Sequence, residues 1–143
     1  MSWVLRTFQV EVSNQCLVAL MAYDDMMLAM KQLDYTRFWY SVNPFLMGVG
    51  NVSKLLWNKK AKFKSLRKDL RDSLSITDAS PLYDRDFRNI YEHYDEKLEV
   101  GIKESDGKGM VDSIITPFLE DLTIAKNKGR KNILRHYDNP RKY

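Results

Sequence analysis

Apolar residues recur every three or four positions over most of the chain, and this spacing places them along one face of an α-helix. The clearest run begins at Phe8 and ends at Leu33. Its apolar members are Phe8, Val12, Cys16, Ala19, Tyr23, Met26, Met30 and Leu33. The pattern predicts one long helix near the start of the chain, with its methionine-rich half packed into the core because methionine fills irregular space.

Three further segments have helical patterns. The second covers about residues 35–58, where Pro44 is expected to start or kink the helix because proline has no N–H to donate. The third follows the apolar residues Phe63, Leu66, Leu70 and Leu74 and is strongly basic on its other face. Ser80 and Pro81 suit the N-cap and first position of a fourth helix. Its apolar stripe is Phe87, Ile90, Tyr91, Tyr94, Leu98 and Ile102.

The end of the chain is less uniform. Val111, Ile114, Ile115, Phe118, Leu122 and Ala125 have helical spacing, broken or capped at Pro117. The alternative is a small C-terminal β appendage formed by residues 110–115 and 132–137. Overall the patterns predict an all-α bundle in a single domain over residues 1–143, with about 107–143 as a C-terminal extension.

Composition narrows the class of protein. The chain has 143 residues, a net charge of +4 and 44% hydrophobic residues, which suits one domain with a core and excludes intrinsic disorder. A single cysteine excludes a disulfide framework. The sequence contains neither an apolar run of membrane-spanning length nor a signal-peptide pattern. We therefore expect a soluble, cytoplasmic protein that does not associate with a membrane.

Charge is distributed unevenly along the chain. Residues 54–72 hold eight basic and two acidic residues, and residues 126–143 hold seven basic and one acidic. Residues 84–106 have the opposite balance, with eight acidic and four basic residues. Basic segments favour a polyanionic partner such as RNA, because phosphate contacts release counterions. The candidate RNA-binding residues are Lys59, Lys60, Lys62, Lys64 and Arg67. The alternative is a solvated helix face followed by a basic tail.

Several chemistries have no support in the sequence. The segment 48–54 lacks the spacing and the preceding strand of a phosphate-binding loop, and we interpret its small residues as a place where helices pack closely. Only two histidines are present, far from Cys16, so no metal site and no cofactor are expected. Cys16 lies on an apolar stripe and is interpreted as an inert core thiol.

One short segment carries residues suited to RNA cleavage. Arg88, Asn89 and His93 lie on the predicted fourth helix, with Asn89 one turn from His93. Imidazole acts as a general acid or base near neutral pH, and a guanidinium stabilises charge on a phosphate. A straight helix does not bring Arg88 and His93 to one atom, so catalysis needs a second copy of the helix. The alternative is that both residues are structural parts of an exposed helix.

The run Arg88-Asn89-Ile-Tyr-Glu-His93 resembles the signature of the HEPN superfamily. In that signature an Arg is followed by a polar residue, and four to six residues in total separate the Arg from a His; here four residues do. Together with residues 51–57, it is similar to small bacterial HEPN-like proteins, and the resemblance covers about residues 8–102. A bundle of four to five helices is implied, forming a homodimer with the two motifs facing each other.

By resemblance, His93 is the acid or base, Arg88 the phosphate clamp and Asn89 the polar motif residue. The implied function is a metal-independent ribonuclease of the toxin or phage-defence type, with an antitoxin or another protein as partner. The alternatives are a non-catalytic HEPN module that binds nucleotide, RNA or protein, and a plain helical interaction protein. Glu92, Asp95 and Glu96 make the surroundings of His93 acidic, which disfavours a phosphodiester. Arg130 and His136 also match the loose spacing but lie outside any apolar stripe.

Overall fold

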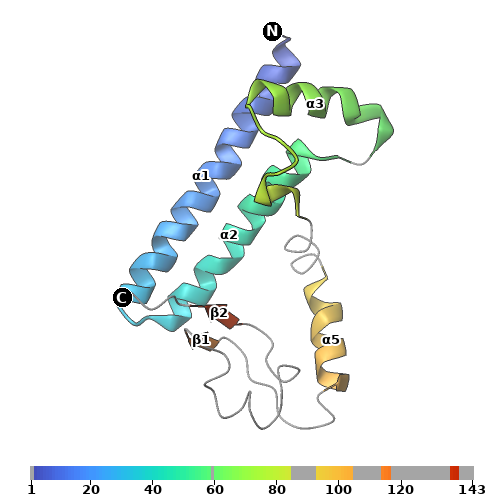
Figure 1. Ribbon diagram of the computed structural model, residues 1–143. Helices are drawn as coiled ribbons and strands as arrows, with labels where there is room; N and C mark the ends of the chain where they lie inside the picture. Colours follow the sequence, from blue (N-terminus) through green and yellow to red (C-terminus); the bar gives the residue numbers. More distant parts are fainter. Residues whose placement is uncertain (1, 59, 85–92, 105–113, 117–135, 139–143) are drawn as a thin grey trace. The chain divides into compact units, whose positions relative to one another are not determined.

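The computed structural model describes residues 2–58, 60–84, 93–104, 114–116 and 136–138, and these are mostly helical, as the periodicity predicts. The chain divides into two compact units, Met1–Glu92 and His93–Tyr143. The first unit contains α1 (Trp3–Lys31), α2 (Tyr35–Leu56), the 3₁₀ turn η1 (Ala61–Phe63), α3 (Lys64–Ser73) and the 3₁₀ turn η2 (Pro81–Tyr83) (Figure 1). The second contains α5 (Tyr94–Glu104), β1 (Ile114–Thr116) and β2 (His136–Asp138).

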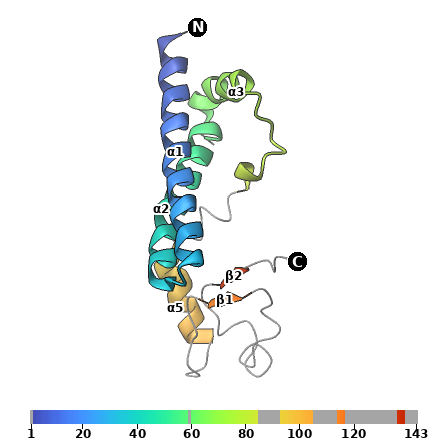
Figure 2. The same ribbon diagram turned by 90° about the vertical axis from the view of Figure 1, so that its left-hand side faces the viewer.

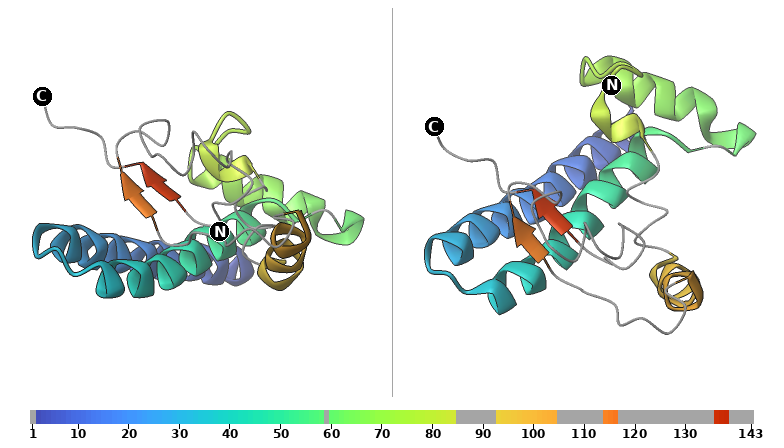
Figure 3. Two further views of the ribbon diagram at one scale, coloured as in Figure 1. Left: turned by 90° about the horizontal axis from the view of Figure 1, so that it is seen from below. Right: turned by 60° about the horizontal axis from the view of Figure 1, so that its bottom comes forward.

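Helices α1 and α2 form an antiparallel hairpin and lie side by side along their lengths (Figures 2 and 3). The two helices pack closely at Gly48 of α2. A Cβ atom built on Gly48 would lie 2.9 Å from the carbonyl oxygen of Gln15 and 3.1 Å from the Cβ of Ala19. Only glycine fits this distance, so Gly48 serves close helix packing, as expected for the small residues of segment 48–54. Nearby, the Asn51 side-chain amide donates a 3.0 Å hydrogen bond to Oε1 of Gln15.

The ends of α1 and α3 share one backbone motif. After α1, Leu33 has φ of 57°, the amide of Leu33 bonds the carbonyl of Met30, and the amide of Asp34 bonds that of Ala29. After α3, Ser75 has φ of 55° and the equivalent pair of hydrogen bonds forms. This is the Schellman arrangement, which usually has glycine at the left-handed position. Asp34 also caps α2, because its Oδ1 accepts from the amide of Arg37 at 2.9 Å.

Helix α3 lies across the end of the hairpin where α1 begins and α2 ends (Figure 1). The core cluster at this end consists of Val12, Val52, Leu56, Trp57 and Leu70. Leu56 and Leu70 are fully buried, and burying a side chain of this size stabilises the fold by about 1.5–3 kcal/mol. Cys16 packs against the same cluster, and its burial raises the pKa of the thiol, in agreement with an inert core cysteine.

The structure bears on three local expectations. Pro44 does not start a helix, because α2 begins at Tyr35 and continues through Pro44. Ser80 and Pro81 start only the short turn η2, because the backbone at Asp84 is extended. Ile114 and Ile115 belong to a strand and not to a helix.

The second unit contains a helix and a two-stranded sheet. Strands β1 and β2 pair in parallel, with Ile114 opposite His136 and Thr116 opposite Asp138. The strands overlap the two intervals expected for a β appendage. Helix α5 has Asp95 and Glu96 in its first turn and Lys103 in its last, an arrangement that complements the helix dipole.

Candidate nucleic-acid interface

Exposed basic side chains are concentrated around η1 and the start of α3. Lys60, Lys62 and Lys64 are all exposed, and none forms an ion pair with a residue that the structure describes. The Nζ atom of Lys62 lies 4.8 Å from the centre of the Phe63 ring, which supports the lysine stem without neutralising its charge. These three residues are named the lysine surface below. Lys59, the fourth expected lysine, lies outside the described residues.

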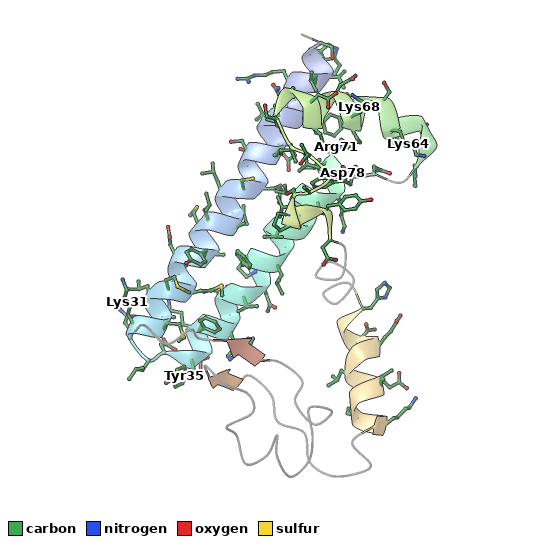
Figure 4. The ribbon with its side chains drawn as sticks, in the orientation of Figure 1. Lys31, Tyr35, Lys64, Lys68, Arg71 and Asp78 are labelled. Atoms are coloured by element: carbon green, nitrogen blue, oxygen red, sulfur yellow. The ribbon has the colours of Figure 1, made fainter. Side chains whose placement is uncertain are left out.

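Two other lysines on the helices are paired with acidic residues one turn away. Lys68 of α3, labelled in Figure 4, forms an ion pair with Asp72, and the hydrogen bond that it donates to this carboxylate raises the pKa of the lysine. In α5, the Nζ atom of Lys103 lies 2.7 Å from Oε1 of Glu99. A phosphate group must compete with the carboxylate for such a lysine, so these two residues are less suited to binding a polyanion.

Arg67 does not have the exposed position expected of an RNA-binding residue. It is only 8% exposed, and its guanidinium lies 4.1 Å from the centre of the Phe8 ring. Its Nε and Nη1 atoms are buried and have no hydrogen-bond partner among the described residues. Burial lowers the pKa of this arginine because the charged form is desolvated. Arg67 therefore belongs to the packing between α3 and α1, and not to the lysine surface.

A cluster of polar and aromatic side chains fixes the end of the hairpin next to the lysine surface. Nη1 of Arg71 donates a 2.7 Å hydrogen bond to the carbonyl of Leu56, in the last turn of α2. Nε of the same arginine lies 3.6 Å from Oδ1 of Asp78, and the two side chains meet in Figure 4. Trp57 donates to the same carboxylate oxygen and packs edge-to-face on Tyr83, with ring centres 5.6 Å apart.

The described part of the HEPN-like motif is His93. It immediately precedes α5, and its side chain is 53% exposed. Its Nδ1 atom lies 3.3 Å from Oε1 of Glu96, so a carboxylate lies beside the imidazole. Arg88 and Asn89 lie outside the described residues, as does the expected helical segment over 87–92. An exposed imidazole is accessible to substrate, and a carboxylate at Nδ1 leaves Nε2 available for proton transfer.

Two features of the structure were not part of the sequence-based expectations. The first is the cluster of Trp57, Arg71 and Asp78, for which the sequence offers no signal because its members are separated by a helix and a loop. The second is an apolar stripe on the exposed side of α1. Its signal is present in the sequence, since Trp3, Val10 and Leu17 are spaced by seven residues.

Comparisons with known proteins place no constraint on these assignments. No protein-family model matches the chain, and neither a curated protein nor a solved structure matches it. Among the described helices, none combines the length and the apolar character needed to span a bilayer. The functional argument therefore depends on the chemistry of the described residues and on the resemblance of the motif.

Proposed function

We propose that the protein binds RNA through the lysine surface and has a HEPN-like helical fold of four to five helices. The observation that carries this proposal is that Lys60, Lys62 and Lys64 are exposed and unpaired among the described residues. Lysines of this kind release counterions from a polyanion when they contact its phosphates. Their spacing along one turn and the start of a helix suits successive phosphates of a flexible single strand better than one small anion.

The proposed reaction is metal-independent cleavage of the bound RNA by a homodimer. In this proposal His93 transfers a proton between the ribose 2′-hydroxyl and the leaving 5′-oxygen. The 2′-oxygen attacks the neighbouring phosphorus, the bond to the 5′-oxygen breaks, and a cyclic phosphate forms. Arg88 stabilises the charge on the phosphate oxygens and Asn89 positions the imidazole. The exposure of His93 supports this role because the imidazole is open to solvent and not enclosed by other described side chains.

The cleavage step is tested with single-stranded RNA in the presence of EDTA. The purified protein is expected to cut the RNA and leave cyclic phosphate ends, and His93→Ala is expected to abolish cutting. The matched control is His136→Ala, which removes the other histidine and is expected to leave the rate unchanged. Unchanged cutting by the His93 variant, or equal loss in both variants, would refute the assignment of His93.

A second function is favoured by one specific observation, the 3.3 Å contact between His93 and Glu96. A carboxylate beside the imidazole repels a phosphodiester and favours a protein that binds RNA without cleaving it. For such a non-catalytic module, His93→Ala lowers the melting temperature or alters the dimer but removes no nuclease activity. Glu96→Gln separates the two functions, because removing the negative charge is expected to speed up a nuclease and to leave a binding module inactive.

A further inference from the structure

The outer side of α1 carries large apolar side chains that nothing in the described part of the chain covers. They are Trp3, Val10, Leu17, Leu20, Met21 and Leu28, between 42% and 79% exposed. The buried residues of α1 lie about 150° around the helix axis from this stripe, on the face that meets α2. The hairpin is one layer of two helices, so packing against α2 leaves the opposite face of α1 open. Scattered apolar residues are ordinary on a surface, but a continuous stripe marks an interaction site.

The spacing of the stripe is that of a coiled coil. Trp3, Val10 and Leu17 are seven residues apart, and the polar Asp24 continues this series. Met21 lies four residues after Leu17, and Leu28 lies four residues after Asp24. In a heptad repeat, Trp3, Val10, Leu17 and Asp24 therefore occupy d positions, and Met21 and Leu28 occupy a positions. From Trp3 to Leu28 the stripe covers nearly four heptads and about 38 Å, which is enough for a specific helix pair. Thr7 and Asn14 complete the a positions, and a polar residue at such a position fixes the register.

We propose that a second copy of this chain covers the stripe, with the two α1 helices antiparallel about a two-fold axis near residues 15–16. In this arrangement Trp3 lies opposite the second copy's Leu28 and Val10 lies opposite its Met21, so these apolar positions match, while Leu17 lies opposite the second copy's Asn14. Such self-complementarity is what a two-fold interface requires. This inference goes beyond the proposed function, which needs two copies but does not say which surface joins them.

Charge determines the antiparallel direction. Arg6 lies near the start of the stripe and Asp24 near its end, and neither forms an ion pair with a described residue. In the antiparallel pair, Arg6 of each copy lies beside Asp24 of the other. In a parallel pair, arginine would face arginine and aspartate would face aspartate, which is unfavourable.

The surface is tested first by sedimentation equilibrium of the full chain. The wild type is expected at twice the chain mass of 16.9 kDa, and Leu17→Glu combined with Met21→Glu at the mass of one chain. The control is Tyr40→Glu, which places a charge on an exposed aromatic residue of α2 and is expected to leave the dimer intact. A wild type that sediments as one chain, or a double variant that still sediments as two, overturns the proposal.

A cysteine experiment tests the direction and does not depend on the charged variant folding. Val10→Cys and Met21→Cys are made separately, each with Cys16→Ala. After oxidation, a mixture of the two is expected to give a disulfide-linked dimer, whereas each alone gives none. In the antiparallel pair, like positions are separated by about 16 Å along the axis, too far for a disulfide. Linkage within the Val10→Cys variant alone overturns the antiparallel arrangement.

The outcomes are independent of the RNA-binding proposal, whereas the proposed cleavage also needs two copies of the chain. The stripe contains neither His93 nor any residue of the lysine surface. Loss of RNA binding on removal of the lysines, with an unchanged dimer, supports one proposal without affecting the other. Arg6→Asp is expected to raise the dissociation constant of the dimer by about threefold to tenfold, and adding Asp24→Arg is expected to restore it.

Discussion

The indole Nε1 of Trp57 donates a 2.7 Å hydrogen bond to Oδ1 of Asp78. Trp57 is the C-cap residue of α2 and is 6% exposed, whereas Asp78 belongs to the loop after α3. The same carboxylate lies beside Arg71, which also bonds the last turn of α2. One aspartate therefore ties together the end of α2, the helix α3 and the loop that follows it. The lysine surface lies on the segment between α2 and α3, so this cluster determines where the lysines are presented.

Asp78→Ala is expected to lower the free energy of unfolding by about 1–3 kcal/mol, because a buried indole N–H loses its acceptor and Arg71 loses its carboxylate. Asp78→Asn keeps an acceptor oxygen and is expected to lower the free energy of unfolding by less than Asp78→Ala does. The measurement is urea unfolding followed by circular dichroism. Asp72→Ala is the control, since it removes an exposed partner of Lys68 and is expected to change stability by less than about 1 kcal/mol. Equal effects of the Asp78→Ala and Asp72→Ala variants would contradict the central position of Asp78.

Replacing Arg67 by methionine is expected to leave the free energy of unfolding unchanged or to raise it. Methionine keeps the contact with Phe8 and removes a buried charge that lacks hydrogen-bond partners among the described residues. Arg67→Ala also removes the packing and is expected to lower the free energy of unfolding by about 1–3 kcal/mol. Because Arg67 is buried, the methionine variant is also expected to bind RNA as the wild type does. A large loss of RNA affinity would show that Arg67 reaches the strand.

The stability of the fold is expected to fall at alkaline pH partly through Cys16. Burial raises the pKa of this thiol in the folded state above that in the unfolded chain. The folded state therefore holds the thiol proton more tightly. The resulting contribution to the free energy of unfolding is fully present below the ordinary thiol pKa and is lost as the pH rises through the raised pKa of the folded state. The difference in unfolding free energy between wild type and Cys16→Ala, measured from neutral to alkaline pH, is expected to shrink. A difference that does not change with pH would contradict burial of the thiol.

The helices were predictable from the sequence, and the reasons for the errors are physical. Apolar spacing identified α1, α2 and α3 because each buries one stripe. The left-handed backbone at Leu33 and Ser75 could not be predicted, because the usual sequence mark of such a helix end is a glycine and neither position has one. Arg67 was treated as part of a basic run, although its spacing from Phe63 and Leu70 places it on the buried stripe of α3. Helix α1 is apolar on two faces, and the expectation of a single core-facing stripe covers only the face that contains more apolar residues.

Of the candidate site, the sequence offered the lysines, His93 and the acidic residues around His93, but not the cluster around Asp78. The exposure of Lys60, Lys62 and Lys64 agrees with a basic surface, and the pairing of Lys68 with Asp72 needed only the i,i+4 rule. The contact of His93 with Glu96 follows from the same kind of helical spacing. The cluster around Asp78 depends on tertiary packing of α2 against α3, which no local pattern contains.

RNA binding through the lysine surface is tested most directly by the salt dependence of affinity for a single-stranded RNA, measured by fluorescence anisotropy. Lys60→Ala, Lys62→Ala and Lys64→Ala together are compared with the wild type and with a control of equal net charge, Lys31→Ala, Lys68→Ala and Lys103→Ala. Each phosphate contact contributes about 0.7 to the slope of log K against log salt, so the first triple variant is expected to reduce the magnitude of the slope by about 2. The control is expected to keep the wild-type slope. Wild-type affinity that does not change with salt, or equal losses in both triple variants, would contradict the account.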